Sequence, residues 1–307
     1  MKIISYLKSV PERNSNKTKT DLLINYAEGA KKLGDESQVL AIQNWQPSDV
    51  AVIQGWVYDN ISTSHLRLRS EIIKNQLANN RFVCIADANL FGFVPNKKDL
   101  FLRYSFNGVF PSTGIYCDDI VDPNRWNKIK NTINIDIEPI KKGKTVLLCV
   151  QRNGGWSMKG LSNIDWILST VKKLRMHTDR KIVVRSHPGD KRAKEWIKAP
   201  QLRELDQLNA VISPIGTPLE NDLFKCHAVV NHNSSSIVGP IIKGHHAFIT
   251  DPKDSHCAEV ANTDLSLIEN PNLFDRQKWL ERISMFHWSL GELSSGKCWK
   301  HMRQYCS

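Results

Sequence analysis

The chain has 307 residues, of which 41% are hydrophobic, and its formal net charge is +11. This length allows two domains that each bury a core, and no apolar run approaches the roughly 20 residues that cross a bilayer. The seven cysteines form an odd, scattered set without a C-x-x-C pair, which favours a reducing compartment. We therefore expect a cytoplasmic protein without a signal peptide or stable membrane insertion. Its charge favours an anionic partner, namely DNA, an anionic lipid surface or a small ligand.

In the first half of the chain, strand-like and helix-like segments alternate. Residues 51–59 and 81–91 read as strands that run into loops, and residues 65–80 have helical spacing of apolar side chains. Residues 103–119 are rich in Gly, Pro and Ser and read as an irregular loop, and residues 131–144 read as a connector. This alternation predicts a parallel sheet covered on both faces.

The alternation restarts in the second half. An apolar strand within 144–156 breaks into a glycine loop, a helix is expected over 163–177, and further strands end within 181–190, 208–215, 227–236 and 245–251. Residues 274–305 are helical by period and carry three tryptophans, which suit a helix that packs back on the first domain. We expect an α/β fold of two Rossmann-like domains facing a cleft: residues 1–140, residues 141–275, and C-terminal helices over 276–307.

Unusual polar side chains follow the strands of the second domain. In a parallel open sheet, ligands bind at the carboxyl ends of the strands, where loops converge and helix N-termini offer unpaired N–H groups. The candidate anion-binding residues are Arg152, Gly154 and Gly155 after one strand, Arg185 and His187 after the next, Thr217 after a third, and Asn233, Ser234, Ser235 and Ser236 after a fourth. Three serines at the start of a short helix predict a phosphate cradle, since capping alone needs one hydroxyl.

A His-Pro pair at one strand end and a serine run at another resemble two motifs of the GT-B glycosyltransferases. More narrowly, they resemble the bacterial group of capsule Kdo transferases and sialyltransferases, in which these motifs hold the phosphate of a nucleotide-sugar donor. The resemblance implies that His187, Pro188 and Ser234 to Ser236 bind the donor and that Gly244 ends the helix that follows. It covers residues 144–270. One departure is that Gly239 and Pro240 stand where many members carry a Glu that holds the ribose.

The resemblance implies no metal and no cofactor, because a helix dipole and basic residues stabilise the departing phosphate in such enzymes. An inverting transfer needs a base in the first domain, and Asp87 is the first candidate because it follows a strand as the acidic residue does in the Kdo transferases. Its rivals as base are Asp118, Asp119 and Asp59. We expect Trp56, Asp59, Arg103, Ser105, Asn107 and Gly108 to line the acceptor side.

The basic charge favours double-stranded DNA as the acceptor. Basic clusters at 65–74 and 191–198, with Trp56, Trp156 and Trp196 nearby, would bind phosphates and stack or wedge bases. Phage DNA glycosyltransferases, which this chain resembles in size and charge, transfer a sugar to a hydroxymethylated pyrimidine flipped from the duplex. Two alternatives stay open: a capsule or wall polysaccharide transferase with a CMP- or CDP-linked donor, and a non-enzymatic nucleic-acid-binding protein on a GT-B scaffold. Sugar, nucleotide, anomeric outcome and oligomeric state are left open by the sequence.

Overall fold

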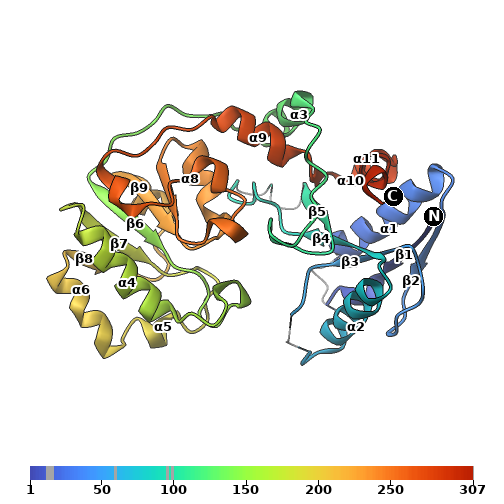
Figure 1. Ribbon diagram of the computed structural model, residues 1–307, viewed down its shortest axis with the longest axis horizontal. Helices are drawn as coiled ribbons and strands as arrows, with labels where there is room; N and C mark the ends of the chain where they lie inside the picture. The colour runs from blue at the N-terminus through green and yellow to red at the C-terminus, as the bar shows by residue number, and fades with distance from the viewer. Residues whose placement is uncertain (12–16, 59–60, 95–96, 98–99, 307) are drawn as a thin grey trace. The chain divides into compact units, whose positions relative to one another are not determined.

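The computed structural model describes residues 1–11, 17–58, 61–94, 97 and 100–306. Contacts divide the chain into two compact units, which are described separately below. Unit 1 comprises Met1–Ile133 and Leu280–Ser307, and unit 2 comprises Asn134–Trp279. The divisions therefore fall at 133 and 279, where the sequence suggested 140 and 275. Each unit contains a sheet with helices beside it (Figure 1).

Unit 1 is built on a mixed sheet in the order β11-β5-β4-β3-β1-β2. The first four strands of the chain pair in parallel, whereas β5 runs antiparallel to β4 and β11 antiparallel to β5. The expectation of a purely parallel sheet is therefore wrong at this edge. The strands are β1 Lys2–Tyr6, β2 Glu36–Leu40, β3 Val50–Gln54, β4 Phe82–Asp87, β5 Leu102–Phe106 and β11 His287–Trp288.

The central strands of unit 1 are buried on both faces, as near-continuous apolar strands require. Successive residues alternate between two cores: Ile3 packs with helix α1 (Lys17–Lys32), and Ile4 packs with helix α2 (Ser64–Ala78). Helix α3 (Pro123–Ile133) follows a loop, so the expected connector at 131–144 begins within a helix. The expected irregular loop at 103–119 likewise contains most of β5, because its Gly- and Pro-rich turn masks the short buried strand before it.

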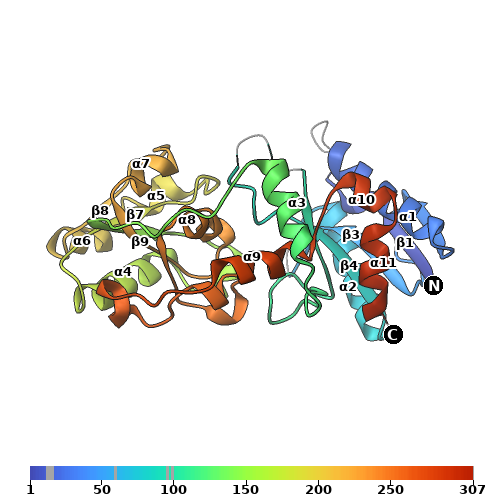
Figure 2. The ribbon, with the colours of Figure 1, turned by 90° about the horizontal axis from the view of Figure 1, so that it is seen from above.

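The C-terminal segment returns to unit 1, as the sequence predicted, but not as one helix (Figure 2). It forms α9 Arg276–Ser284, β11, α10 Leu290–Ser294, α11 Lys297–Met302 and the 3₁₀ turn η9 Arg303–Tyr305. Its tryptophans Trp279, Trp288 and Trp299 are all buried. Trp299 anchors the segment because its Nε1 donates a 2.6 Å hydrogen bond to Asp35 beside the N-terminal strand.

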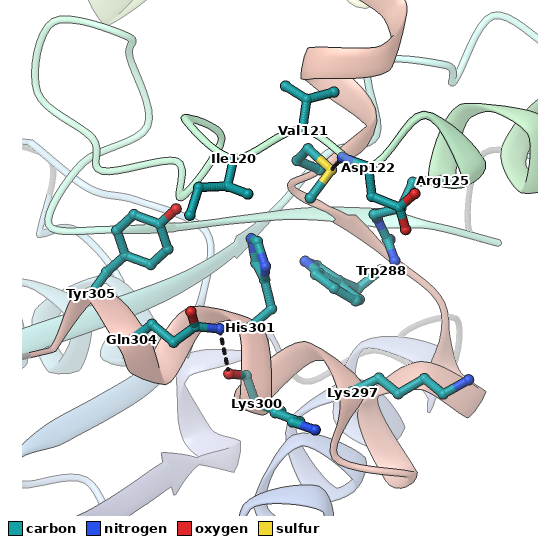
Figure 3. A pocket seen from close by; sticks show the side chains of 11 residues that line it. Ile120, Val121, Asp122, Arg125, Trp288, Lys297, Lys300, His301, Gln304 and Tyr305 are labelled. Atoms are coloured by element: carbon teal, nitrogen blue, oxygen red, sulfur yellow. Dashed lines mark hydrogen bonds between the residues drawn. The ribbon is translucent and has the colours of Figure 1, made fainter.

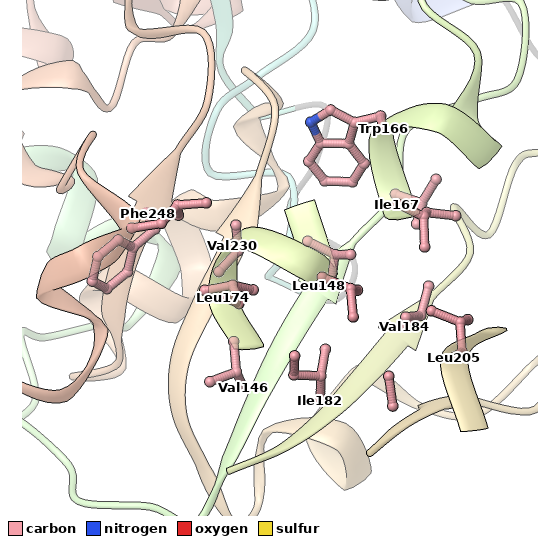
Figure 4. Packing of buried hydrophobic residues seen from close by; sticks show 14 of the residues in the cluster. Val146, Leu148, Trp166, Ile167, Leu174, Ile182, Val184, Leu205, Val230 and Phe248 are labelled. Atoms are coloured by element: carbon pink, nitrogen blue, oxygen red, sulfur yellow. The ribbon is translucent and has the colours of Figure 1, made fainter. Parts of the chain in front are cut away.

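Unit 2 is a five-stranded parallel sheet in the order β10-β9-β6-β7-β8, with a core of aliphatic side chains around Trp166 and Phe248 (Figure 4). From β6 the chain runs outward through β7 and β8, then returns to β9 on the other side of β6, which is the doubly wound order. The strands are β6 Thr145–Cys149, β7 Lys181–Arg185, β8 Ala210–Ile212, β9 Cys226–Asn231 and β10 His246–Ile249. Four of the five lie within the segments predicted from the sequence, and β9 begins one residue before its predicted segment.

The longest helix of unit 2 is α4 (Asn163–Arg175), whose Trp166, Ile167 and Leu174 are buried against the sheet as its spacing predicted. The remaining helices are single turns. They are η3 Trp156–Met158, α5 Ala193–Trp196, η4 Pro200–Arg203, α6 Glu204–Gln207, α7 Leu219–Leu223, η5 Ser235–Ile237, α8 Val238–Ile242, η6 Pro252–Asp254, η7 Ala258–Val260 and η8 Leu265–Glu269. Over the described ranges of both units, the structure contains no helix with the length and hydropathy of a membrane span.

Candidate functional site

The reversal of strand order between β6 and β9 marks the switch point of the unit 2 sheet. At such a point the loops leave in opposite directions and open a crevice at the carboxyl ends of the strands, where ligands of doubly wound proteins bind. The loop after β6 begins at Val150, and the loop after β9 begins at His232. Both carry residues that the sequence singled out.

Hydrogen bonds join the loops at this edge into one polar cluster. The side-chain oxygen of Gln151 accepts from the backbone N–H of Asn233 at 3.1 Å. The Asn233 amide donates in turn to the carbonyl of Ser157 at 3.2 Å and to the carboxylate of Asp251, after β10, at 2.9 Å. Asn233 is therefore the residue through which the loops after β6, β9 and β10 are held together.

The serine run stands at a helix start, as predicted. Ser234 is the N-cap of η5, and its hydroxyl accepts from the backbone N–H of Ser236 at 3.2 Å. Ser235 and Ser236 are exposed, and helix α8 continues directly from η5. The Ser234 hydroxyl therefore caps the helix by accepting a backbone N–H of its first turn. The side chains of Ser235 and Ser236 are left facing solvent.

The loop after β7 is fixed to the loop after β6 by Asp190. Its carboxylate accepts from the backbone N–H of Asn153 at 3.1 Å and from the indole of Trp196 at 2.8 Å. Gly154 adopts φ +69° in this loop, where an L-side chain would be strained, and Gly155 donates its N–H to the carbonyl of Arg152 at 3.0 Å. The glycine pair therefore shapes a tight turn at the end of β6.

His187 is oriented by its own loop. Its Nδ1 accepts the backbone N–H of Gly189 at 2.9 Å, so the neutral ring carries its proton on Nε2. Burial lowers the pKa of His187, and the Arg152 guanidinium nearby lowers it further. The ring is therefore neutral at pH 7, and Nε2–H is a donor with no hydrogen-bond partner in the part of the chain that the structure describes.

Two residues predicted to bind the donor, Arg185 and Thr217, already have partners within unit 2. Arg185 forms an ion pair with Asp222 at 2.6 Å, and Ser213 donates to the same carboxylate at 2.9 Å. The charge of Arg185 is thus neutralised locally. The hydroxyl of Thr217 donates to the carbonyl of Pro214 at 2.8 Å and closes a turn.

A cation that sequence analysis missed lies in the same cluster. Lys159 lies 2.6 Å from the buried carboxylate of Asp254 and 3.4 Å from Asp251, and both carboxylates raise the pKa of Lys159. Lys159 has φ +49°, a conformation that costs a side-chain-bearing residue free energy. The sequence does contain one indication of this cluster: Asp251 and Asp254 follow β10, at the carboxyl end of a further strand.

Two buried amide oxygens near these loops are unsatisfied. The Oδ1 atoms of Asn163 and Asn231 have no hydrogen-bond partner within the described ranges, although their nitrogens donate to Gln151 and Ser234. An unsatisfied buried acceptor costs about 1–3 kcal/mol. Both residues are almost fully buried, so this cost is carried inside the domain.

In unit 1, Asp87 ends β4 and forms an ion pair with Arg103 of β5 at 2.6 Å. Burial acts to lower the pKa of Arg103, but the Asp87 carboxylate prevails and holds it above the usual value. A second guanidinium, that of Arg69, is buried nearby and donates to the carbonyl of Ser9 at 2.8 Å and to the Gln54 side chain at 3.2 Å. Asp87 thus sits at the carboxyl end of its strand with two arginines around it.

Three of the other residues predicted to line the acceptor side, Ser105, Asn107 and Gly108, stabilise the turn after β5. The hydroxyl of Ser105 donates to the carbonyl of Gly108 at 2.6 Å. Asn107 adopts φ +61° and exchanges hydrogen bonds with Val83 through its backbone N–H and side-chain oxygen, both at 2.9 Å. A Cβ on Gly108 would lie 2.4 Å from the Thr113 hydroxyl, so only glycine fits. The side chains of Ser105 and Asn107 therefore hydrogen-bond to the backbone of unit 1.

Asp118 and Asp119 are also paired, with Arg282 and with the hydroxyl of Tyr305 respectively. Trp56 follows β3 and packs against the α2 core, and its buried indole nitrogen has no partner among the residues described. Asp59 lies outside the described residues. Within the described ranges, no group of three His, Cys, Asp or Glu side chains is arranged to hold a metal ion.

Comparisons with known proteins bear on the fold. No protein-family model and no curated protein matches the chain. Among solved structures, the beta Kdo 2,4 transferase of Thermosulfurimonas dismutans KpsC is 13% identical over 87% of this chain and 89% of that chain, with a TM-score of 0.52. The beta Kdo 2,7 transferase of the same KpsC is 12% identical over 97% of this chain and 98% of that chain, with a TM-score of 0.51. The chain therefore has a GT-B-like fold of two Rossmann-like domains.

Proposed function

We propose that the protein is a glycosyltransferase that binds a nucleotide sugar at the switch point of unit 2. The observation that carries this proposal is that exposed Ser235 and Ser236 and the donor Nε2–H of His187 follow β9 and β7, the two parallel strands that flank β6, at their carboxyl ends. Hydroxyls and N–H groups together suit a diphosphate or a phosphodiester. A likeness in fold to Kdo transferases supports the same reading.

In this proposal the donor-site residues act on the departing phosphate. As the bond between the anomeric carbon and the phosphate oxygen breaks, negative charge develops on that oxygen, and fixed N–H donors stabilise it. Arg152, Gly154, Gly155 and Asn233 shape the loops, whereas Arg185 and Thr217 act through the packing of the domain because their polar groups are already paired.

Asp87 is the residue we propose as base. It would take the proton of the acceptor hydroxyl while the acceptor oxygen forms its bond to the anomeric carbon. Asp118 and Asp119 stay as alternatives, since each of them, like Asp87, has one side-chain partner, Arg282 and Tyr305 respectively. Arg103 positions the Asp87 carboxylate through the 2.6 Å ion pair.

We propose a glycan as the acceptor, because the two structures with a similar fold are Kdo transferases by name. The donor in this proposal is a CMP- or CDP-linked sugar. DNA is the second candidate, favoured by the net charge of +11. Two residues expected to contact DNA are buried, however, and have other partners. Arg69 donates a hydrogen bond to the carbonyl of Ser9, and the Trp196 indole donates one to Asp190. This weakens the case for a hydroxymethylpyrimidine acceptor.

The test is calorimetric titration with UDP-, CMP-, CDP-, GDP- and ADP-sugars, followed by transfer assays. Acceptors are a Kdo-terminated oligosaccharide and duplex DNA containing hydroxymethylcytosine. We expect one nucleotide sugar to bind, His187→Ala to weaken it, and the oligosaccharide to be glycosylated. Binding followed by transfer to DNA alone would replace the glycan with DNA. The absence of binding by every nucleotide sugar would overturn the donor site and favour a nucleic-acid-binding protein.

A further inference from the structure

A pocket of about 380 Å³ opens in unit 1, and neither Asp87 nor Arg103 lines it (Figure 3). It lies between the loop before α3, the strand β11 and the C-terminal helices. One wall is apolar and the other carries cations and hydrogen-bonding groups. Its lining consists of Ile120, Val121, Asp122, Arg125, Met285, Trp288, Lys297, Lys300, His301, Gln304 and Tyr305.

The polar side of the pocket contains an unused donor. Trp288 is only 4% exposed, and its indole Nε1–H has no hydrogen-bond partner in the described part of the chain. Figure 3 shows this nitrogen on the side of the ring that faces His301. The Arg125 guanidinium stacks on the indole at 3.6 Å, which fixes the orientation of the ring. A buried N–H without a partner costs about 1–3 kcal/mol, so a ligand acceptor there is stabilising.

Charge around this donor favours an anion. The pocket is lined by Arg125, Lys297 and Lys300 and by one carboxylate, that of Asp122. Glu292 engages Arg125, whereas the ammonium groups of Lys297 and Lys300 have no ion-pair partner over the described ranges. Both lysines lie on the exposed rim of α11, where long side chains can reach a bound group.

The ring of His301 adds no charge. Its Nε2 donates to the carbonyl of Cys117 at 2.7 Å, and burial lowers its pKa, so it is neutral at pH 7. Tyr305 is likewise engaged, through its hydroxyl, with Asp119. The anion would therefore be held by the indole N–H and the two rim lysines.

The opposite wall is apolar and open to solvent. Ile120 is 69% exposed and Val121 is 40% exposed, and the buried Met285 also lines the pocket. Exposure of these two adjacent β-branched side chains to water is unfavourable. An apolar ligand group that covered them would bind more favourably by about 25 cal/mol per Å² of apolar surface buried. A ligand that satisfies both walls has an anionic end and a short apolar body.

We infer that this pocket binds an anionic amphiphile, a phosphate monoester or diester with an apolar substituent. The phosphate accepts from the Trp288 indole and pairs with Lys297 and Lys300, and the substituent lies on Ile120 and Val121. This inference stands apart from the proposed donor site, since no residue of that site lines the pocket. The same chemistry occurs in a soluble alkyl phosphate and in an anionic lipid headgroup.

The probe is hexyl phosphate, titrated into ¹⁵N-labelled protein while the indole N–H signals are followed. The Trp288→Phe variant identifies the Trp288 signal. We expect that signal to shift saturably with hexyl phosphate, and inorganic phosphate and hexanol each to bind at least about tenfold more weakly. The Lys297→Glu/Lys300→Glu variant should lose about tenfold in affinity. A matched double reversal of exposed lysines on α1 and α2, Lys31→Glu/Lys74→Glu, should bind normally.

Co-sedimentation with phosphatidylglycerol-containing vesicles, compared with phosphatidylcholine vesicles, separates the two sources. Binding that disappears in Lys297→Glu/Lys300→Glu supports a lipid headgroup, and hexyl phosphate binding without vesicle binding supports a soluble ligand. A Trp288 signal unmoved by hexyl phosphate would overturn the inference. Equal weakening by the α1 and α2 lysine pair would overturn it as well, since net charge alone would then explain the binding.

Discussion

Gly29 in helix α1 lies against the backbone of Leu293 in helix α10, so closely that a Cβ on Gly29 would lie 2.0 Å from the Leu293 carbonyl oxygen. That oxygen already accepts the N–H of Gly296 at 2.9 Å, where the chain turns from α10 into α11. This contact is what allows the C-terminal segment to pack on the first helix of unit 1.

Gly29→Ala should therefore destabilise the protein. Alanine favours a helix by about 1 kcal/mol over glycine, but backbone atoms on both sides leave no room for the methyl group, and overpacking costs about 1–3 kcal/mol or more. We expect a net loss of about 2 kcal/mol in the free energy of unfolding, measured by urea titration. The control is Gly291→Ala in α10, where a Cβ meets nothing within 4 Å and stability should hold or rise. Equal stability of both variants would contradict this packing.

The serine run allows capping to be separated from ligand binding. Ser234→Ala removes the hydroxyl that accepts from Ser236 and should cost about 1 kcal/mol of stability. Ser235→Ala removes an exposed hydroxyl and should leave stability unchanged while lowering affinity for the nucleotide sugar about tenfold. Thermal unfolding and calorimetry of the two variants check this. If Ser235→Ala bound the donor normally, the cradle would consist of backbone groups alone.

Asp87→Asn tests the base. The amide keeps an oxygen for Arg103 but cannot take a proton, so we expect transfer to fall about 1000-fold. Donor affinity should be unchanged, because the donor residues lie in unit 2. Initial rates and calorimetry measure the two quantities, and the melting temperature shows whether the variant is folded. Asp118→Asn and Asp119→Asn are the matched variants; loss of transfer in either, with Asp87→Asn active, would move the role.

The sequence predicts unit 2 more fully than unit 1, for a physical reason. Parallel strands such as β6 and β9 are buried on both faces, so each reads as an unbroken apolar run that ends in a polar loop. The edge strands of unit 1 are different. Two-residue β11 interrupts what the period suggests is one helix, because Trp288 is buried by packing at the sheet edge and not along a helix face.

In the candidate site too, some features follow from local sequence pattern and others depend on contacts between segments distant in sequence. The positions of His187 and Ser234 at strand ends follow from local pattern, and the structure brings their loops to one edge of the sheet. The pairing of Arg185 with Asp222 does not follow from local pattern, since it joins the end of β7 to helix α7, 37 residues further along the chain. Lys159 was missed for a related reason: its partner Asp254 is distant in sequence, and its positive φ leaves no compositional trace.

Glu292 provides a pH-dependent contribution to stability at the return of the C-terminal segment. Its side chain is 6% exposed, lies 3.1 Å from Arg125 and 2.7 Å from Lys128, and accepts the backbone N–H of Ser289 at 3.0 Å. Burial acts to raise the pKa of Glu292, but Arg125 and Lys128 prevail and lower it. A carboxyl with a lowered folded-state pKa contributes stability that is complete above its unfolded pKa, about 4.3, and is lost as pH falls through the folded pKa.

Glu292→Gln keeps an oxygen acceptor for Ser289 and removes the charge. We expect it to lower the free energy of unfolding by about 1–3 kcal/mol at pH 7, because Arg125 is then buried without its counter-ion. The difference from the wild type should shrink as pH falls below about 4.3, since the wild-type carboxyl becomes neutral too. Urea titrations from pH 7 to pH 3.5 measure this. The control Glu195→Gln breaks an exposed pair with Arg192 and should change little at any pH. A Glu292→Gln difference that stays constant down to pH 3.5 would show that the charge is not the stabilising feature.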